Sequence, residues 1–287
     1  MSLSGFMGEA YAGKVRGEKR LEEKRGEFLL GFEDLAQRLE ERPKRAEVEA
    51  LAPRDGETIL SLVHSASPKG RREGMIWGIL TSLAAERLPS PLVIQPQDYA
   101  GLELRGGTII LDAKASPPGS KGWGSDGSGQ VRGSWNRAHH LGERISGGRL
   151  VVRGGAGDYL GQEMVGGGIV AASCGDYAFR NMRGGWGVVR GDAGNYLAVG
   201  NSGGKIAVKG RAGARAGWLM RSGRIRVRRD AGEYLGLMMS GGEISLLGKA
   251  GARAGWRMRG GLIEAEGYGP QAGDDSVGGR LLCRGDP

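Results

Sequence analysis

Apolar residues alternate with polar residues in short segments that recur about every nineteen residues over the last two-thirds of the chain. Three consecutive copies span residues 203–221, 222–240 and 241–259. Each copy opens on a glycine-containing pair, and apolar residues stand at the third and fifth positions after its start. Alternation with a period of two is typical of a β-strand that buries one face. Each copy therefore predicts one strand.

The same register extends on both sides of these copies. Glycine-rich starts recur at intervals of 18 or 19 residues from residue 128 to residue 278, and a degenerate copy begins near Asp98. The third position after each start is usually aliphatic. It holds Ile109, Val131, Leu150, Ile169, Ile206, Ile225, Ile244, Ile263 and Leu281. Such a column predicts a continuous buried face that neighbouring copies share.

The rest of each copy is rich in glycine, and its pattern is not helical. A glycine costs about 1 kcal/mol in a helix interior, whereas it suits tight corners with positive φ. Parallel strands joined by such short, turning segments form a coil with one turn per copy. We therefore predict an all-β fold, a right-handed parallel β-helix of about ten turns of about nineteen residues.

Two further columns support this stacking. The seventeenth position holds Ile145, Met164, Met220, Met239 and Met258. We interpret these as a core ladder rather than a metal site, because methionine fills irregular gaps in cores. The twelfth position mixes aromatic and basic residues, and it predicts that Arg215 stacks between Tyr196 and Tyr234.

Residues 1–87 lack the repeat and are predicted to form an arm and a helical cap region, whereas residues 88–287 form the β-helix domain. Helical spacing predicts helices over 27–41 and 70–88, with a linker over 44–57 and a short strand over 58–63. The second helix is assigned to capping the coil, because an open solenoid end exposes its core and strand edges. For the first helix, binding a partner and packing on the coil remain alternatives.

Charge is concentrated in the repeat region. Residues 106–287 hold 25 basic and 15 acidic side chains, which accounts for the net charge of +9. An apolar strip rimmed by basic residues is typical of a partner surface. Its predicted members are Arg149, Val151, Arg153, Val170, Val188, Arg190, Lys209 and Arg228. Nucleic acid is disfavoured as the partner because aromatic residues are few and no nucleic-acid motif occurs.

No catalytic, cofactor or metal-binding residues are predicted. Gly155–Gly161 resembles a dinucleotide fingerprint only superficially, since its glycines recur in every copy. His139 and His140 are adjacent and point to opposite faces of an extended chain. Cys174, near a corner, and Cys283, in the inward column, have no CxxC spacing that would suggest zinc or an iron–sulfur cluster. With no signal peptide or membrane span in view, we expect a cytoplasmic protein.

The unit Gly-Gly-x-Ile-x-Val-x-Gly-x-Ala-Gly-x-x-x-Gly-x-x-Met resembles the GXGXG repeat family over residues 98–282. One branch of that family is the repeat-bearing scaffold subunit of formylmethanofuran dehydrogenase, with its relative in the formyltransferase/hydrolase complex. The other is the carboxyl-terminal domain of the glutamate synthase large subunit. The resemblance implies a right-handed β-helix that positions catalytic neighbours. The regular period and the segment Ala212–Met220 look closer to the first branch.

Three functions remain open from the sequence. The first is a non-catalytic scaffold subunit of a cytoplasmic one-carbon enzyme complex. The second is a glutamate synthase-like domain that acts beside a flavin and iron–sulfur core. The third is a free-standing enzyme or polyanion-binding solenoid that uses the insertion at residues 116–140. The partners expected under the first two are other protein subunits, and a homo-oligomer is also compatible with the pattern.

Overall fold

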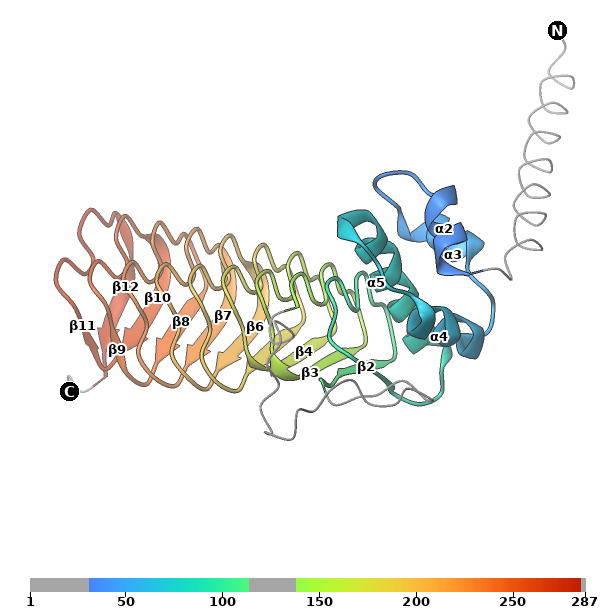
Figure 1. Cartoon of the computed structure of the whole chain (residues 1–287). Helices are drawn as coiled ribbons and strands as arrows, with labels where there is room; N and C mark the ends of the chain where they lie inside the picture. Colours follow the sequence, from blue (N-terminus) through green and yellow to red (C-terminus); the bar gives the residue numbers. More distant parts are fainter. Residues whose placement is uncertain (1–30, 114–137, 285–287) are drawn as a thin grey trace, which may run out of the picture.

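The computed structural model describes residues 31–113 and 138–284, which form a β-solenoid preceded by helices (Figure 1). Ten parallel strands make one sheet in which each strand pairs with the strand of the next coil. In sheet order they are β1 (Leu92–Ile94), β2 (Thr108–Leu111), β3 (Arg149–Gly155), β4 (Gly168–Ser173), β5 (Trp186–Val189), β6 (Ser202–Val208), β7 (Ser222–Val227), β8 (Glu243–Leu246), β10 (Arg259–Ala265) and β12 (Gly278–Cys283). The predicted first strand and the stacked coil are confirmed. The repeat predicts about ten turns, and these strands delimit nine.

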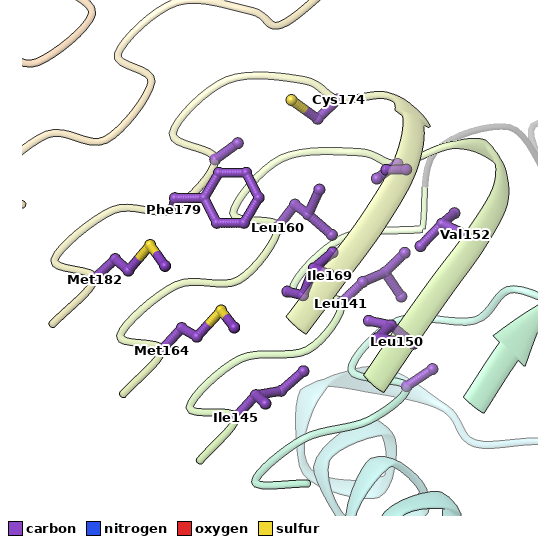
Figure 2. Close-up of a cluster of buried hydrophobic side chains, with 14 of the residues drawn as sticks. Leu141, Ile145, Leu150, Val152, Leu160, Met164, Ile169, Cys174, Phe179 and Met182 are labelled. Carbon is purple, nitrogen blue, oxygen red and sulfur yellow. The ribbon is translucent and has the colours of Figure 1, made fainter. Parts of the chain in front are cut away.

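The inward columns form the core, as their alternation predicts. Ile169, Ile206 and Ile225 are each at most 2% exposed, and their partners on adjacent strands are in direct register. Figure 2 shows how inward side chains from successive coils pack on one another, with Met164 and Met182 along one flank. Met164, Met220 and Met239 are completely buried, so the methionine column is a core ladder, as expected.

The glycine-rich part of each coil forms a wall of turns that is hydrogen-bonded from coil to coil. In the coil after β6, Arg215, Gly217 and Leu219 all have positive φ, near 60–70°. The N–H of Arg215 donates forward to Glu233 O at 2.8 Å, whereas the N–H of Gly217 donates back to Leu197 O at 2.8 Å. This alternation satisfies backbone groups that would otherwise be buried without partners.

A stack of side chains runs along this wall at the first of these positive-φ positions. Tyr159, Tyr177 and Tyr196 stack with ring centroids 4.6–5.2 Å apart. The guanidinium of Arg215 lies 5.4 Å from the ring of Tyr196 and 5.3 Å from that of Tyr234. The prediction for Arg215 is therefore confirmed. Each such contact stabilises the wall by roughly 0.5–1 kcal/mol.

A third line of contacts follows the corner after the main strands. Cys174, Ala193, Ala212, Ala231 and Ala250 form a ladder of single parallel bridges. Ala250 belongs to the short strand β9 (Lys249–Ala250), which pairs in parallel with β11 (Gly267–Tyr268) of the next coil. Small side chains fit here because successive backbones pack closely at this corner.

Acidic and amide side chains beside this corner also join neighbouring coils. Asp158 Oδ1 accepts the N–H of Asp176 at 2.9 Å, and Asp176 Oδ1 accepts that of Asn195 at 2.7 Å. Asn195 Oδ1 in turn accepts the N–H of Ala214 at 2.9 Å. These carboxylates and amides are therefore structural acceptors.

In the described part of the chain, four helices cap the β1 end of the solenoid, namely α2 (Phe32–Arg38), α3 (Arg45–Leu51), α4 (Gly56–Ser65) and α5 (Gly70–Arg87). The predicted helix at 70–88 is confirmed as α5, and it packs on β1 and β2. None of the helices among the described residues is long and apolar enough to cross a membrane.

Two expectations for the region before α5 are wrong. The predicted linker at 44–57 contains α3, and the predicted strand at 58–63 lies within α4. The reason is local: Asp55 Oδ1 accepts the N–H of Thr58 at 2.7 Å and caps the helix, and Ile59 and Val63, four residues apart, share its buried face.

The helix predicted at 27–41 is described only in part, as α2. Its apolar side chains Phe32 and Leu35 are buried, and α2 packs against α4. Of the two alternatives for this helix, packing within the chain is observed, although on the cap rather than on the coil. Residues 27–30 and the arm before them lie outside the described residues.

Buried polar contacts fasten the cap to the first coil. Arg45 is 3% exposed, and its Nη2 lies 2.6 Å from Glu86 Oε2 on α5. Its Nη1 donates to Glu103 O at 2.7 Å, while Glu86 Oε1 accepts the N–H of Arg105 at 2.9 Å. One buried arginine and one glutamate thus connect α3, α5 and the coil.

The core pattern breaks at one coil, where Gly187 stands in the isoleucine column between Ile169 and Ile206. The cause is Phe179, which is fully buried in a column otherwise occupied by glycine and alanine. A Cβ added to Gly187 would overlap the ring of Phe179. The large and the small residue have exchanged places between two neighbouring columns, so the ring fills the space that the glycine leaves. Figure 2 shows the ring of Phe179 among the inward side chains of neighbouring coils.

The methionine ladder is also interrupted once, by Asn201. The carbonyls of Met182, Asn201 and Met220 accept equivalent hydrogen bonds from successive coils, so Asn201 occupies the same column. Its side chain is fully buried, and neither Oδ1 nor Nδ2 has a hydrogen-bond partner among the described residues. A buried amide without partners destabilises a fold by about 1–3 kcal/mol.

The exchange between Phe179 and Gly187 predicts a strong coupling in a double-mutant cycle. Phe179→Ala should lower the free energy of unfolding by about 3–5 kcal/mol because it leaves a cavity. Gly187→Ile should also destabilise, because its side chain meets the ring. The double variant should recover most of the loss, as measured by chemical denaturation. Additive losses would show that the two sites do not share one space.

Asn201→Met should raise the free energy of unfolding by about 1–3 kcal/mol, since it removes the unpaired amide and restores the ladder. Met220→Leu, in the next coil, is a matched control that should change stability by less than about 1.5 kcal/mol. A loss of stability in Asn201→Met would mean that the amide makes a favourable interaction in the folded protein.

Candidate docking surface

The residues of the predicted partner surface come together on the outer face of the sheet. Val151 on β3 pairs in register with Val170 on β4, which pairs with Val188 on β5. The column continues to Ile110 and Val93 on one side and to Ala207 on the other. We call these six side chains the valine strip. Sequence reasoning identified only its three central valines, although Val93 and Ile110 stand at the same alternating position.

Exposure varies along the valine strip. Val93 is 45% exposed, whereas Val170 is only 6% exposed. Val151 and Val188 flank Val170 in register and lie between these extremes. The expectation of an outward apolar column is right for its direction, but the centre of the column, at Val170, is buried rather than open.

An aromatic residue that sequence reasoning missed forms one edge of the strip. Arg149, Gly168 and Trp186 are partners in register on β3, β4 and β5. The ring of Trp186 lies over Gly168, where a Cβ would overlap it, and the guanidinium of Arg149 is 5.4 Å from the ring centroid. In the sequence, the glycine at position 168, where the neighbouring strands carry Arg149 and Trp186, is the feature that could have predicted this arrangement, because it leaves space for the ring. Trp186 remains 38% exposed, so it can contribute to an interface.

The opposite edge of the strip is basic, with one difference from the prediction. Arg153 is not a free cation, because its Nη1 lies 2.7 Å from Asp112 Oδ2 in the preceding coil. Arg190, Lys209 and Arg228 follow the ends of β5, β6 and β7 in three successive coils. All three are exposed, and none has an ion pair within the described parts of the chain. We call these three residues the basic rail.

The basic rail has an electrostatic cost when nothing is bound to it. Adjacent coils are about 4.8 Å apart, and two like charges at that distance repel by about 1 kcal/mol in water. The long, flexible side chains of the basic rail reduce this repulsion when their charged ends move apart. An acidic surface placed against the rail would remove it and would add attraction.

The two adjacent histidines in the coil between β2 and β3 have structural roles. His140 stacks between Tyr99 and Tyr159 with centroid distances of 4.9 and 4.8 Å, and its Nδ1 is 2.9 Å from Glu143 Oε2. His139 Nδ1 accepts the N–H of Asp158 at 3.1 Å. In residues 31–113 and 138–284, no three His, Cys, Asp or Glu side chains gather closely enough to hold a metal ion. Of the predicted insertion at 116–140, residues 116–137 lie outside the described residues.

The two cysteines differ in environment. Cys174 is buried in the corner ladder, and burial raises the pKa of its thiol to about 12. Its thiolate is therefore scarce at neutral pH, which argues against a nucleophilic role. Cys283 lies in the inward column, in register with the buried Ala265, as predicted. It is nevertheless exposed, because β12 is the last strand of the sheet and no described coil covers it.

Comparison with known proteins does not add a relative. The chain matches no family model and no curated protein. The surface geometry and the residues quoted above for the GXGXG resemblance are therefore the basis for a functional proposal.

Proposed function

We propose that this protein is a non-catalytic scaffold subunit of a multi-subunit enzyme complex, and that a partner subunit docks on the valine strip and the basic rail. The observation that carries the proposal is an apolar column, with an exposed tryptophan at one edge and three cations at the other that have no ion pair among the described residues. Interfaces typically combine an apolar centre with a polar rim and are enriched in tryptophan and arginine.

The filled interior supports a scaffold role. Apart from Gly187 and Asn201, the inward columns of the described coils consist of aliphatic, methionine and phenylalanine side chains, which are nearly all fully buried. The buried ionisable group Arg45 bonds a backbone carbonyl and the carboxylate of Glu86. A rod of this kind is stiff, because every coil packs on the next, and it suits the positioning of other proteins.

The proposal includes the family that the repeat resembles. Under this proposal the solenoid is right-handed, and the protein belongs beside the catalytic subunits of a one-carbon enzyme complex such as formylmethanofuran dehydrogenase or the formyltransferase/hydrolase complex. The support is the glycine and methionine pattern and its regular period. Co-purification of a flavin and iron–sulfur synthase would instead favour the glutamate synthase branch.

A matched pair of variants tests the docking surface. Val188→Asp with Arg190→Glu changes the strip and the rail, whereas Val165→Asp with Lys249→Glu makes the same chemical changes elsewhere. Val165 is 48% exposed, and Lys249 lies in the separate β9–β11 sheet. The tagged protein would be purified from its native host, and the bound proteins would be identified and quantified by mass spectrometry.

The first variant should weaken partner retention by at least about tenfold, because it places two negative charges in an apolar and basic interface. The second variant should retain the partner as the unmodified protein does. Equal retention by both variants, with circular dichroism unchanged, would refute this surface.

A further inference from the structure

A second surface feature crosses the carboxyl-terminal half of the solenoid. A groove of about 740 Å³ runs along the starts of β6, β7, β8, β10 and β12, at the opposite ends of these strands from the basic rail. Its floor is a line of glycines, Gly204, Gly223, Gly242 and Gly261, one in each of four successive coils. The groove does not overlap the valine strip and does not depend on the docking proposal.

The glycine floor is a consequence of the fold. Gly223 has φ of +95°, and a Cβ there would lie 2.8 Å from the carbonyl oxygen of Gly203. Gly261 has φ of +92°, and a Cβ there would lie 2.7 Å from the methyl group of Met239. Larger residues are therefore excluded, and the floor has no side chains. The glycines alone say nothing about a ligand, which must be inferred from the walls.

The walls of the groove carry an excess of positive charge. Lys205, Arg224 and Arg280 line it, and Glu243 is the single carboxylate among the lining residues. Glu243 is already paired, since its Oε2 lies 2.8 Å from Arg224 Nη2. Lys205 and Arg280 are exposed and make no ion pair in the described part of the chain.

More cations lie along the same coils. Arg221 and Arg259 precede Gly223 and Gly261 by two residues. Both are exposed and have no ion pair with any described residue. The groove therefore has four unpaired cations in and beside it and no unpaired carboxylate among its lining residues. Such a groove concentrates anionic ligands.

The length of the groove and the chemistry of its walls limit which class of anionic ligand it can bind. No aromatic residue lines the groove, so it lacks the stacking surfaces that single-stranded nucleic acids use. Lys205 and Arg280 are four coils apart in register, which corresponds to about 19 Å. An extended peptide covers this length with about six residues, at about 3.4 Å per residue. We infer that this groove binds an extended, glutamate- or aspartate-rich segment of a partner protein.

Fluorescence anisotropy with the full-length protein tests this inference. The probe is a fluorescein-labelled peptide of seven alternating glutamate and serine residues, and its control has glutamine in place of glutamate. The groove variant is Lys205→Glu with Arg280→Glu. Its matched control is Lys249→Glu with Arg180→Glu, which makes the same charge change at two exposed residues outside both the groove lining and the basic rail. Circular dichroism checks the fold of each variant, and Lys205→Gln with Arg280→Gln replaces the groove variant if that one does not fold.

The acidic peptide should bind the unmodified protein, and the glutamine peptide should not. The groove variant should weaken binding by about tenfold or more, whereas the control variant should change it less than about twofold. Equal weakening in both variants would mean that net charge alone attracts the peptide, and no binding to the unmodified protein would also overturn the inference. A labelled oligothymidylate that binds more tightly, and depends on the same two residues, would reassign the groove to nucleic acid.

Discussion

The solenoid depends on a left-handed backbone that recurs at fixed positions in every coil. In the coil that begins with β6 these positions are Gly204, Arg215, Gly217 and Leu219. A non-glycine residue costs about 1 kcal/mol in this conformation, so each coil stores some strain. The same conformation directs N–H groups alternately to the coils before and after, and it aligns the Tyr–Arg stack that offsets the cost. The backbone strain and the side-chain stacking therefore both result from the left-handed conformation at these positions.

The sequence was informative wherever a column repeated. The inward isoleucines, the buried methionines and the position of Arg215 between two tyrosines were all predictable, because the same residue type returns at a constant interval. The roles of Gly187 and Asn201 were not predictable, because each interrupts its column once, and its effect depends on side chains that are close in space but distant in sequence. Helix α3 and helix α4 were missed because their segments are short and their packing partner, α5, lies further along the chain.

The placement of the residues in the proposed docking surface was predictable in part for the same reason. Alternation places Val151, Val170 and Val188 on one outer column, and stacking brings them into register. The alternation of apolar and polar residues along one strand does not predict contacts between neighbouring coils. The ion pair of Arg153 with Asp112 and the position of Trp186 over Gly168 are therefore seen only in the structure. Side chains in the outer columns do not have to fill the core, so their size and charge can vary from coil to coil. The solenoid can therefore carry distinct binding surfaces side by side without a change in its core.

The most direct test of the coil is a measurement of how distance grows along it. Spin labels at Val93 and Leu282, which are 45% and 44% exposed, lie nine strands apart in one outer column, and labels at Val93 and Arg226 lie six strands apart. With Cys283 replaced by serine, double electron–electron resonance should give backbone separations of about 43 and 29 Å, in proportion to the number of coils at about 4.8 Å each. Two distances that do not scale with the number of intervening strands would contradict the stacked coil.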